Sequence, residues 1–325
     1  MEIGSAAINR LRNDEGVMKM NINKAHQLFG HMDERKTRDI AAQLDIEVTR
    51  GSFQPCESCA KAKNKQKNVP KKSEHEESNI AGERLFFDLS TIKANNSSNI
   101  KIRNPNWLIC VDEKTKLKFS SFHMKKSEIA KVLCEKVENF KGEGKFVKYM
   151  RCDNAGENKK TEKLANSEAW KHKLKFEYTA RNTPQQNHLA EIGFTVIANR
   201  ARAMLDLANI PSNMKVELCN EALNNATQLD GLTVTEINGI KQTRYEHWNG
   251  SIPKWSKHLR TWGEAGVVKT ATKKIPKIYN RGETMIFVGY SENHDGDCFR
   301  MFNPSTKRVW NTRDVVFLSS LNAVK

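Results

Sequence analysis

RLFFDLSTI, residues 84–92, sets the architecture of the central part of the chain. The stretch has the apolar and aromatic composition of a short buried strand, yet Asp88 stands in its middle. A carboxylate inside an apolar strand is costly unless it is paired or binds a metal. We therefore expect this strand to place a functional carboxylate, and the flanking sequence indicates which groups meet it.

The segments that follow predict a mixed α/β domain with a central sheet. Residues 106–124 are typical of two strands joined by a turn at 112–116, and "KFVKYMRC" and "KFEYTA" are typical of two more. Helical spacing of apolar residues predicts four helices, the first with Ser127 as its N-cap. These helices are expected at residues 127–140, around 161–174, at 189–207 and at 213–227.

Three carboxylates belong to different elements of this domain. Asp88 lies within the first strand, Asp153 directly follows the fourth strand, and Glu191 lies on the first turn of the helix after "RNTPQQN". Carboxylates that converge from several elements form the oxygen-rich site that Mg²⁺ prefers. A first-turn glutamate is also stabilised by the helix dipole alone, and that role for Glu191 is compatible with metal binding. Asp112 lies in a predicted turn and is left outside the site.

A second metal site is predicted before this domain. His26 and His31 are separated by four residues, and Cys56 and Cys59 form a CxxC after an interval of twenty-four residues. Two imidazoles and two thiolates match the tetrahedral preference of Zn²⁺. Because the segment is short and poor in apolar residues, we expect a structural zinc to supply much of its folding free energy.

The charge of the chain favours a polyanionic partner. Its 325 residues include 54 Lys+Arg against 38 Asp+Glu, a formal net charge of +16. Such an excess is typical of nucleic-acid binding, which gains from counterion release. One concentration of lysines is a predicted flexible linker with Lys61, Lys63 and Lys65, and another follows residue 254 and includes Lys273 and Lys274. We expect these lysines to bind phosphate.

The cysteine content and the hydropathy of the chain indicate the cellular compartment in which it is expected. The seven cysteines are odd in number and contain one closely spaced pair, so they do not indicate a disulfide framework. No apolar run approaches the length of a membrane span. A reducing intracellular compartment is therefore expected.

The C-terminal residues are typical of a small β domain. "TMIFVGYS", "CFRMFNP" and "KRVWNTRDVVFL" alternate as short strands, with a turn at 303–306 between the last two. Trp255, Trp262 and Tyr279 are interspersed among the basic residues that precede them. For these aromatic residues, core packing is the favoured role over DNA contact.

The combination of segments resembles the integrases of copia-type long-terminal-repeat retrotransposons, within the wider retroviral integrase family. The resemblance rests on the His-His-Cys-Cys module, on Asp88, on "DNAGE" from Asp153, and on "TPQQNHLAEI", whose acid is Glu191. It extends to residues 243–263 and 286–317, and so covers nearly the whole chain after residue 20.

This resemblance implies a ribonuclease-H-like catalytic core and an SH3-like C-terminal β-barrel that binds DNA. It implies that Asp88, Asp153 and Glu191 hold two Mg²⁺ or Mn²⁺ ions for DNA strand transfer. Asn154 and Asn187 flank these acids and are equally interpreted as substrate ligands or as local turn residues. The expected boundaries are 1–60 (zinc module), 61–82 (basic linker), 83–235 (core), 236–262 (extension) and 263–325 (β domain).

The resemblance also implies partners and a place of action. Double-stranded DNA, both element ends and target, is the expected partner, and the enzyme is expected to act as a homodimer or homotetramer in the nucleus after a cytoplasmic particle stage. Protease and reverse-transcriptase motifs are not found in the chain, so we expect it to correspond to the integrase portion of a Pol polyprotein.

The chain departs from the family pattern after Asp88, where "LSTIK" stands in place of the usual Gly-Pro, and at three positions beside the other two acids. Ala155 and His188 stand where glycine is usual, and Ile192 stands where a basic residue usually follows the glutamate. His188 and Ile192 favour an alternative in which the chain is a catalytically decayed or repurposed DNA-binding or assembly module, whereas the three retained acids favour an active enzyme. A cellular nuclease is disfavoured by the zinc module and the basic C-terminal part.

Overall fold

The computed structural model describes residues 11–12, 18–49, 51–63, 77–93, 101–178, 187–269, 278, 280–292 and 294–322. The chain divides into two compact units. The core unit comprises residues 64–198 and 235–251, and the terminal unit comprises residues 1–63, 199–234 and 252–325. Helix α6 (His188–Leu207) contributes to both, because the division falls after residue 198.

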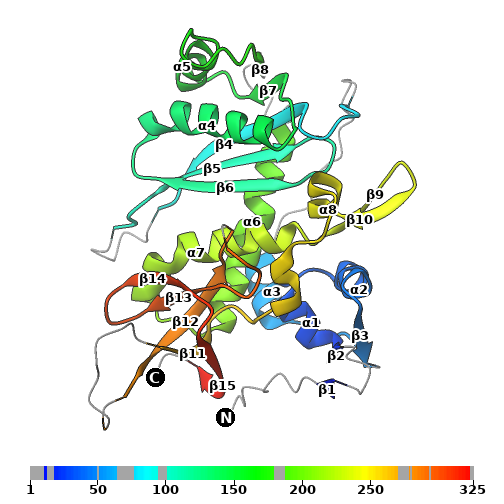
Figure 1. The fold of residues 1–325 in the computed structure, drawn as a ribbon, viewed down its shortest axis with the longest axis vertical. Coiled ribbons are helices and arrows are strands. Elements are labelled where there is room, and N and C mark those ends of the chain that lie inside the picture. The colour runs from blue at the N-terminus through cyan, green and yellow to red at the C-terminus, as the bar shows by residue number, and fades with distance from the viewer. Residues whose placement is uncertain are drawn as a thin grey trace. The chain divides into compact units, whose positions relative to one another are not determined.

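The core unit is built on a mixed five-stranded sheet of order β6-β5-β4-β7-β8 (Figure 1). Strands β6, β5 and β4 pair antiparallel, whereas β4, β7 and β8 pair in parallel. This is the mixed α/β domain with a central sheet that was predicted from the sequence. The strands are β4 (Arg84–Thr91), β5 (Asn106–Asp112), β6 (Lys118–His123), β7 (Tyr149–Cys152) and β8 (Lys175–Tyr178).

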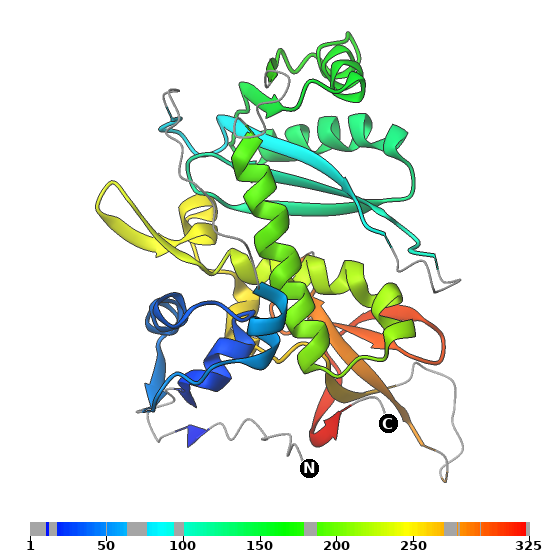
Figure 2. The same cartoon turned by 180° about the vertical axis from the view of Figure 1, so that it is seen from behind.

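Side chains alternate between two covered faces of this sheet, as the period of a strand requires. Leu85, Phe87 and Leu108 belong to a hydrophobic cluster that also contains residues of α4 (Ile129–Gly142) and α5 (Gly156–Ala165). The alternate residues face α6, which crosses the other side of the sheet (Figure 2). There Trp107 packs edge-on against Phe194, with ring centroids 4.7 Å apart.

A glycine allows α6 to approach the sheet closely. A Cβ atom added to Gly193 would lie 2.8 Å from Cδ1 of Ile109, a fully buried side chain of β5. The first turns of α6, which carry Glu191, are therefore held directly against the central strands.

Two local predictions for the core unit were wrong. Ser127 does not cap the helix, because a 3₁₀ turn, η1 (Lys126–Glu128), precedes α4. The helix expected around 161–174 begins earlier, at Gly156, and ends at Ala165. The remaining elements of this unit form a hairpin of β9 (Val234–Ile237) and β10 (Ile240–Thr243) followed by α8 (Arg244–Asn249).

The terminal unit begins with the module that carries the His-His-Cys-Cys residues. Its short helices α1 (Ile22–Leu28), α2 (Glu34–Gln43) and α3 (Glu57–Lys63) accompany a three-stranded sheet. Ile46 begins the last strand of that sheet. The strands are β1 (Leu11–Arg12), β2 (Met18–Asn21) and β3 (Ile46–Thr49).

This module packs on helices of the same unit. A Cβ atom at Gly30 would lie 3.2 Å from Cδ1 of Leu229 on α7 (Ser212–Asp230), and Ser58 Oγ donates to Asp206 on α6 at 3.1 Å. Arg202 donates to the carbonyl of Ala62 at 3.3 Å. The module is therefore stabilised by tertiary contacts as well as by its own residues.

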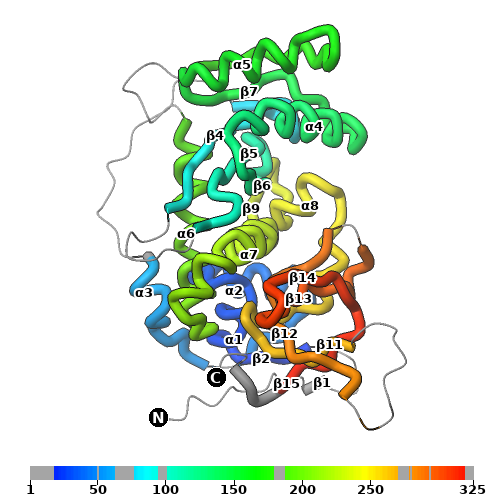
Figure 3. Tube along the Cα trace, turned by 90° about the vertical axis from the view of Figure 1, so that its left-hand side faces the viewer, coloured from blue at the N-terminus to red at the C-terminus, as the bar shows by residue number. Residues whose placement is uncertain are grey.

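The C-terminal part of the terminal unit is an antiparallel five-stranded sheet of order β14-β13-β12-β11-β15 (Figure 3). The stretch "KRVWNTRDVVFL" forms two strands, where one was expected. The turn at 303–306 is confirmed, because Asn303 Oδ1 accepts hydrogen bonds from the amides of Ser305 and Thr306. The strands are β11 (Glu264–Lys269), β12 (Gly282–Tyr290), β13 (Phe299–Asn303), β14 (Arg308–Thr312) and β15 (Val315–Asn322).

The tryptophans near this sheet pack in its core, as predicted. Trp255, in the 3₁₀ segment η3 (Lys254–His258), stacks on Tyr290 with centroids 4.5 Å apart, and Trp262 donates to the carbonyl of Val288 at 3.2 Å. Tyr279 lies outside the described residues. Among the helices that the structure describes, none is long and apolar enough to cross a bilayer.

Candidate active site and metal centre

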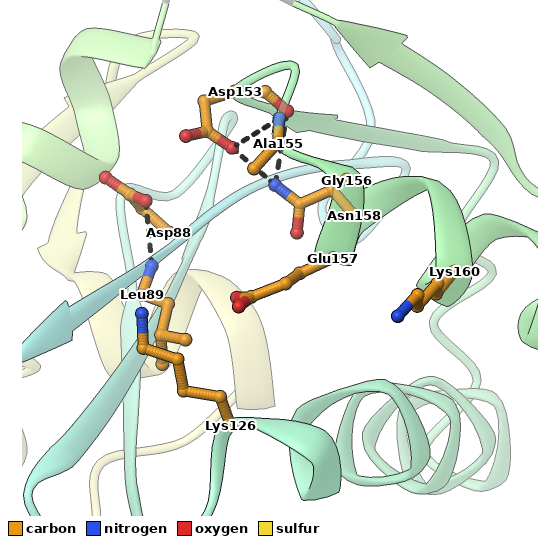
Figure 4. A pocket seen from close by; sticks show the side chains of 9 residues that line it. All are labelled: Asp88, Leu89, Lys126, Asp153, Ala155, Gly156, Glu157, Asn158 and Lys160. Atoms are coloured by element: carbon orange, nitrogen blue, oxygen red, sulfur yellow. Dashed lines mark hydrogen bonds between the residues drawn. The ribbon is translucent and has the colours of Figure 1, made fainter.

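The register between β4 and β7 brings the first two predicted acids together. Phe86 is paired with Arg151 in a parallel ladder, so two residues further along each strand Asp88 is level with Asp153. Asp88 is on the same face of the sheet as Phe86, the face that α6 covers, because side chains two residues apart point the same way. Figure 4 shows the two carboxylates on the same side of one pocket, turned toward each other.

Hydrogen bonds hold the Asp153 carboxylate at the start of α5. Asn158 Nδ2 donates to Asp153 Oδ1 at 2.5 Å and to the Asp153 carbonyl at 3.1 Å, and the Ala155 amide donates to Oδ1 at 3.3 Å. On the strand, Asp88 Oδ1 accepts a local bond from the Leu89 amide at 2.8 Å. Asp153 is therefore positioned by its own turn, and Asp88 is positioned by its strand.

The pKa of Asp88 is raised to about 6, mainly by burial; the negative charges of Asp153 and Glu191 contribute to the rise, and the hydrogen bond from the Leu89 amide opposes it. Burial also raises the pKa of Glu191. A carboxylate that is partly desolvated beside other carboxylates is stabilised by a cation. The site therefore has the electrostatic character of a divalent-cation site, and the donor set suits Mg²⁺ or Mn²⁺.

Replacing Asp88 with asparagine is expected to stabilise the metal-free protein at neutral pH. Since the folded-state pKa of Asp88 lies near 6, above its unfolded value, the folded state binds more protons between those values and stability falls as pH rises through that window. The substitution should raise the free energy of unfolding by about 1–2 kcal/mol at pH 7.5 and leave it unchanged near pH 3. Thermal unfolding in chelator at both pH values measures the difference; equal gains at the two values would contradict it.

The pocket at this site has a volume of about 450 Å³ and includes residues that the sequence did not single out as ligands. Lys126 comes from η1, and Glu157, Asn158 and Lys160 come from α5 (Figure 4). For Glu157, Asn158 and Lys160, the available signal was their position shortly after Asp153, but the helix that carries them was expected to start later. The pocket is lined by Asp88, Leu89, Lys126, Asp153, Ala155, Gly156, Glu157, Asn158 and Lys160.

Glu191 lies on the first turn of α6 and is exposed. It does not line the pocket, although its charge contributes to the raised pKa of Asp88. The loop that precedes it, residues 179–186, lies outside the described part of the chain. Its role as the third metal ligand stays a prediction.

The two predicted substrate asparagines differ in their surroundings. Asn187 is 3% exposed, and its Nδ2 donates to the carbonyl of Phe87 on β4 at 3.1 Å. This bond ties the start of α6 to the strand that carries Asp88, which is a positioning role. Asn154 is exposed beside Asp153, so contact with substrate stays a prediction for it.

Of the predicted phosphate-binding lysines, Lys61 and Lys63 lie in α3 and not in a flexible linker. Lys61 forms an ion pair with Glu57 at 2.7 Å. Lys65, Lys273 and Lys274 lie outside the described residues, and their DNA contacts stay predictions.

The predicted zinc ligands form one cluster. The ligand atoms of His26, His31, Cys56 and Cys59 all lie within 4.8 Å of one another. Cys59 Sγ is 3.2 Å from His26 Nε2, Cys56 Sγ is 3.4 Å from His31 Nδ1, and the two imidazole nitrogens are 3.2 Å apart. Around a tetrahedral zinc with Zn–N and Zn–S bonds of about 2.0 and 2.3 Å, ligand atoms lie roughly 3.3–3.8 Å apart. The cluster therefore fits Zn²⁺.

The protonation of the cluster also suits a metal. His26 Nδ1 lies 2.5 Å from the carbonyl of Met32, which requires that nitrogen to be the donor and leaves the Nε2 lone pair directed at the cluster. A hydrogen bond with Cys59 is the largest cause of a lowered pKa for the Cys56 thiol, and bonds with the two histidines lower it further. All four ligand positions are protein atoms, which is the ligand set typical of a structural zinc site.

Comparisons with known proteins agree with this organisation. Residues 266–323 match the family model of the retroviral polymerase SH3-like domain. The retrovirus-related Pol polyprotein from transposon TNT 1-94 of Nicotiana tabacum is 23% identical over 303 residues, which cover 91% of this chain and 21% of the polyprotein. The chain thus spans about a fifth of that relative's length.

Solved integrase structures show weaker likeness. The HTLV-2 integrase catalytic core domain in complex with magnesium is 16% identical, with a TM-score of 0.36, and covers 52% of this chain and 98% of its own. A chain of the simian T-cell lymphotropic virus intasome in complex with PP2A regulatory subunit B56 gamma is 13% identical, with a TM-score of 0.39, and the match covers 79% of this chain and 85% of that chain.

The His-His-Cys-Cys cluster, the mixed five-stranded sheet and the SH3-like β domain together make the chain integrase-like, of the retroviral and retrotransposon kind. More particularly, the chain is a distant homologue of the copia-type Pol polyprotein of the tobacco transposon TNT 1-94.

Proposed function

We propose that the chain is a retrotransposon integrase that joins element DNA to target DNA by divalent-cation-dependent strand transfer. The observation that carries this proposal is the parallel register of β4 and β7, which sets Asp88 level with Asp153. Two acids in one pocket of an integrase-like chain form the minimum of a cation site for phosphoryl transfer. Glu191 is the proposed third ligand, since α6 begins on the same face of the sheet.

The chain's own residues would position the cations and the strand. Asp88 and Asp153 would share the binding, with Asn158 holding the Asp153 carboxylate in its orientation. Asn187 would keep the start of α6, and hence Glu191, against β4. When bound, the two cations would favour deprotonation of the attacking hydroxyl and stabilise the charge on the leaving oxygen.

The reaction is a transesterification in which the protein forms no covalent bond. The 3′-oxygen of the element end bonds to the target phosphorus, the bond from that phosphorus to the target's 3′-oxygen breaks, and the attacking hydroxyl's proton leaves to solvent. One phosphodiester replaces another, so no external energy source is required.

The remaining parts of the chain support DNA binding. The proposed partners are element-end and target DNA, held by the basic surface that the net charge of +16 predicts. We also propose one structural zinc in the His-His-Cys-Cys cluster, action as a dimer or tetramer that pairs two DNA ends, and a nuclear site of action.

The test is strand transfer of a labelled duplex with the element's terminal sequence into plasmid DNA, with Mg²⁺ or Mn²⁺. Wild type and Glu191→Gln are compared, and DNA affinity is measured in both. Transfer by the wild type that is lost in the variant, at equal affinity, supports the proposal and the role of Glu191. Transfer that survives in the variant assigns the third ligand elsewhere.

A second candidate function is a DNA-binding or assembly module without catalysis. The exposure of Glu191 and of the apolar Ile192 beside it, 52% exposed, favours this alternative. Equal DNA binding without transfer by either protein, under conditions where a related integrase is active, would establish it.

A further inference from the structure

The pocket that contains Asp88 and Asp153 also contains two cationic side chains. Lys126 enters it from η1, before α4, and Lys160 enters it from α5, so they come from different elements (Figure 4). In the close view, the Glu157 side chain lies between them. The pocket thus holds three carboxylates and two ammonium groups.

Neither lysine forms an ion pair with a residue in the part of the chain that the structure describes. This differs from many lysines of the same unit: Lys131 pairs with Glu135 at 3.6 Å and Lys171 pairs with Glu168 at 2.8 Å. Both Lys126 and Lys160 are exposed, so their charges are available to a ligand in the pocket.

Other basic residues do not supply this charge from α6. Residues 188–199, the part of that helix nearest the site, contain no lysine or arginine. Of two consecutive lysine pairs, 125–126 and 159–160, only Lys126 and Lys160 line the pocket. On α5, Lys160 lies three residues after Glu157 and therefore on the same side of the helix.

A DNA strand needs such positive charge here. The carboxylates that would hold the cations also repel a polyanion, and two bound cations neutralise only part of the combined charge of the acids and the phosphates. A lysine ammonium is a compact point charge suited to a phosphate oxygen. A DNA strand that approaches the acids therefore requires positive charge to neutralise its phosphates on either side of the scissile one.

We propose that Lys126 and Lys160 bind backbone phosphates of the DNA strand in this pocket, one on either side of Glu157. The assignment deepens the proposed integrase function and rests on it, since it names the groups that hold the substrate at the same site. The lysines are substrate-binding residues, and they bind phosphate irrespective of base sequence.

The experiment measures DNA affinity of the full-length chain against salt concentration, in chelator, so that its outcome is independent of catalysis. Lys126→Ala/Lys160→Ala is compared with Lys125→Ala/Lys159→Ala. The second pair removes the same charge at the adjacent positions, which are exposed but outside the pocket. Lys126→Arg/Lys160→Arg tests rescue by retained charge.

We expect the pocket pair to lose roughly 10- to 100-fold in affinity near 0.1 M salt, and its log–log salt slope to fall by about 1.4–1.8, or 0.7–0.9 for each lost phosphate contact. The control pair should change affinity by less than about 3-fold, and the arginine pair should approach wild type. Thermal unfolding should be the same for all variants, because these side chains are exposed.

Equal losses in the pocket and control pairs would show a diffuse charge effect and overturn the proposal. Inorganic phosphate is titrated in parallel, and displacement of DNA at low millimolar phosphate would assign the pocket to free phosphate instead. Pocket-specific loss of binding without strand transfer by the wild type would leave the lysine assignment standing and count against the catalytic function alone.

Discussion

Replacement of Cys59 by serine is expected to abolish zinc binding and to unfold the N-terminal module. Cys59 Sγ lies 3.2 Å from His26 Nε2 and 3.5 Å from His31 Nδ1, so it occupies one of four ligand positions around a common centre. A hydroxyl is a poor substitute for a thiolate on zinc. Structural zinc sites contribute on the order of 10 kcal/mol to the folding of small modules, so the effect should exceed that of any single packing change in the module.

The tertiary contacts of the module set the extent of this unfolding. Leu28, Phe29 and Met32 are buried, and Met32 meets Thr233 just after α7. These contacts cannot replace the metal, because the helices they anchor are no longer than ten residues and are marginal alone. We expect α1, α2 and α3 to lose their protection against hydrogen exchange while the core unit keeps its own.

Zinc content per chain and hydrogen exchange measured by mass spectrometry test this expectation. Cys219→Ser is the matched control, since that cysteine lies on α7 in the same unit and its thiol donates to the Val216 carbonyl at 3.2 Å, away from the cluster. The control should retain about one zinc per chain. A Cys59→Ser protein with full zinc content and unchanged exchange would contradict the assignment of the cluster.

Asp153→Asn is expected to lower strand transfer by about a thousandfold or more while the protein stays folded. Asp153 is exposed, and an asparagine oxygen can still accept the bonds from Ala155 and Asn158. The substitution therefore removes charge and little else. Cation-mediated stabilisation of a phosphoryl-transfer transition state is worth several kcal/mol, and each 1.4 kcal/mol is about tenfold in rate.

Asp112→Asn is the matched control, since it is the same chemical change in the same unit. Asp112 is fully buried and accepts bonds from the Gly82 amide at 2.8 Å and from the amide and hydroxyl of Thr115 at 2.8 and 2.7 Å. Its amide analogue would face some of these donors with an NH₂ group. We expect a loss of about 2–4 kcal/mol of stability and unchanged transfer per folded molecule.

Strand-transfer rates and urea unfolding of both variants separate the two roles. Activity is normalised to the folded fraction, and DNA affinity is measured so that a binding defect is not mistaken for a catalytic one. Transfer by Asp153→Asn within tenfold of wild type would remove Asp153 from the site. A stable Asp112→Asn protein with lost activity would show that the sequence-based choice between the two aspartates was wrong.

Local chemistry explains why much of the organisation was predictable. The zinc ligands are identified by residue type and by a CxxC spacing that a single turn can satisfy. The predicted turn follows Asp112, which is the last residue of β5, and the bonds that Asp112 accepts from Thr115 close that turn. The two long helices α6 and α7 begin within a residue of their expected starts, since their apolar periodicity extends over five turns.

Predictions failed where a local signal competed with a tertiary one. Ser127 resembles an N-cap, but a 3₁₀ turn takes its place before α4. The helix after Asp153 has few apolar residues in its first turn, so its start at Gly156 was missed, and with it the pocket residues Asn158 and Lys160. Asn187 was interpreted from its neighbours in sequence, whereas its hydrogen-bond partner Phe87 is 100 residues away.

The sequence by itself determined the elements and the kinds of chemistry: a buried strand with an aspartate, four zinc-type ligands and a basic surface. These follow from side-chain type and short-range periodicity, which do not depend on how distant segments pair. Only the tertiary structure decided which groups share the pocket. Asp88 and Asp153 meet because β4 and β7 pair in one parallel register, and a shift of one residue would turn one carboxylate to the opposite face. That register is set by the core on which both strands pack.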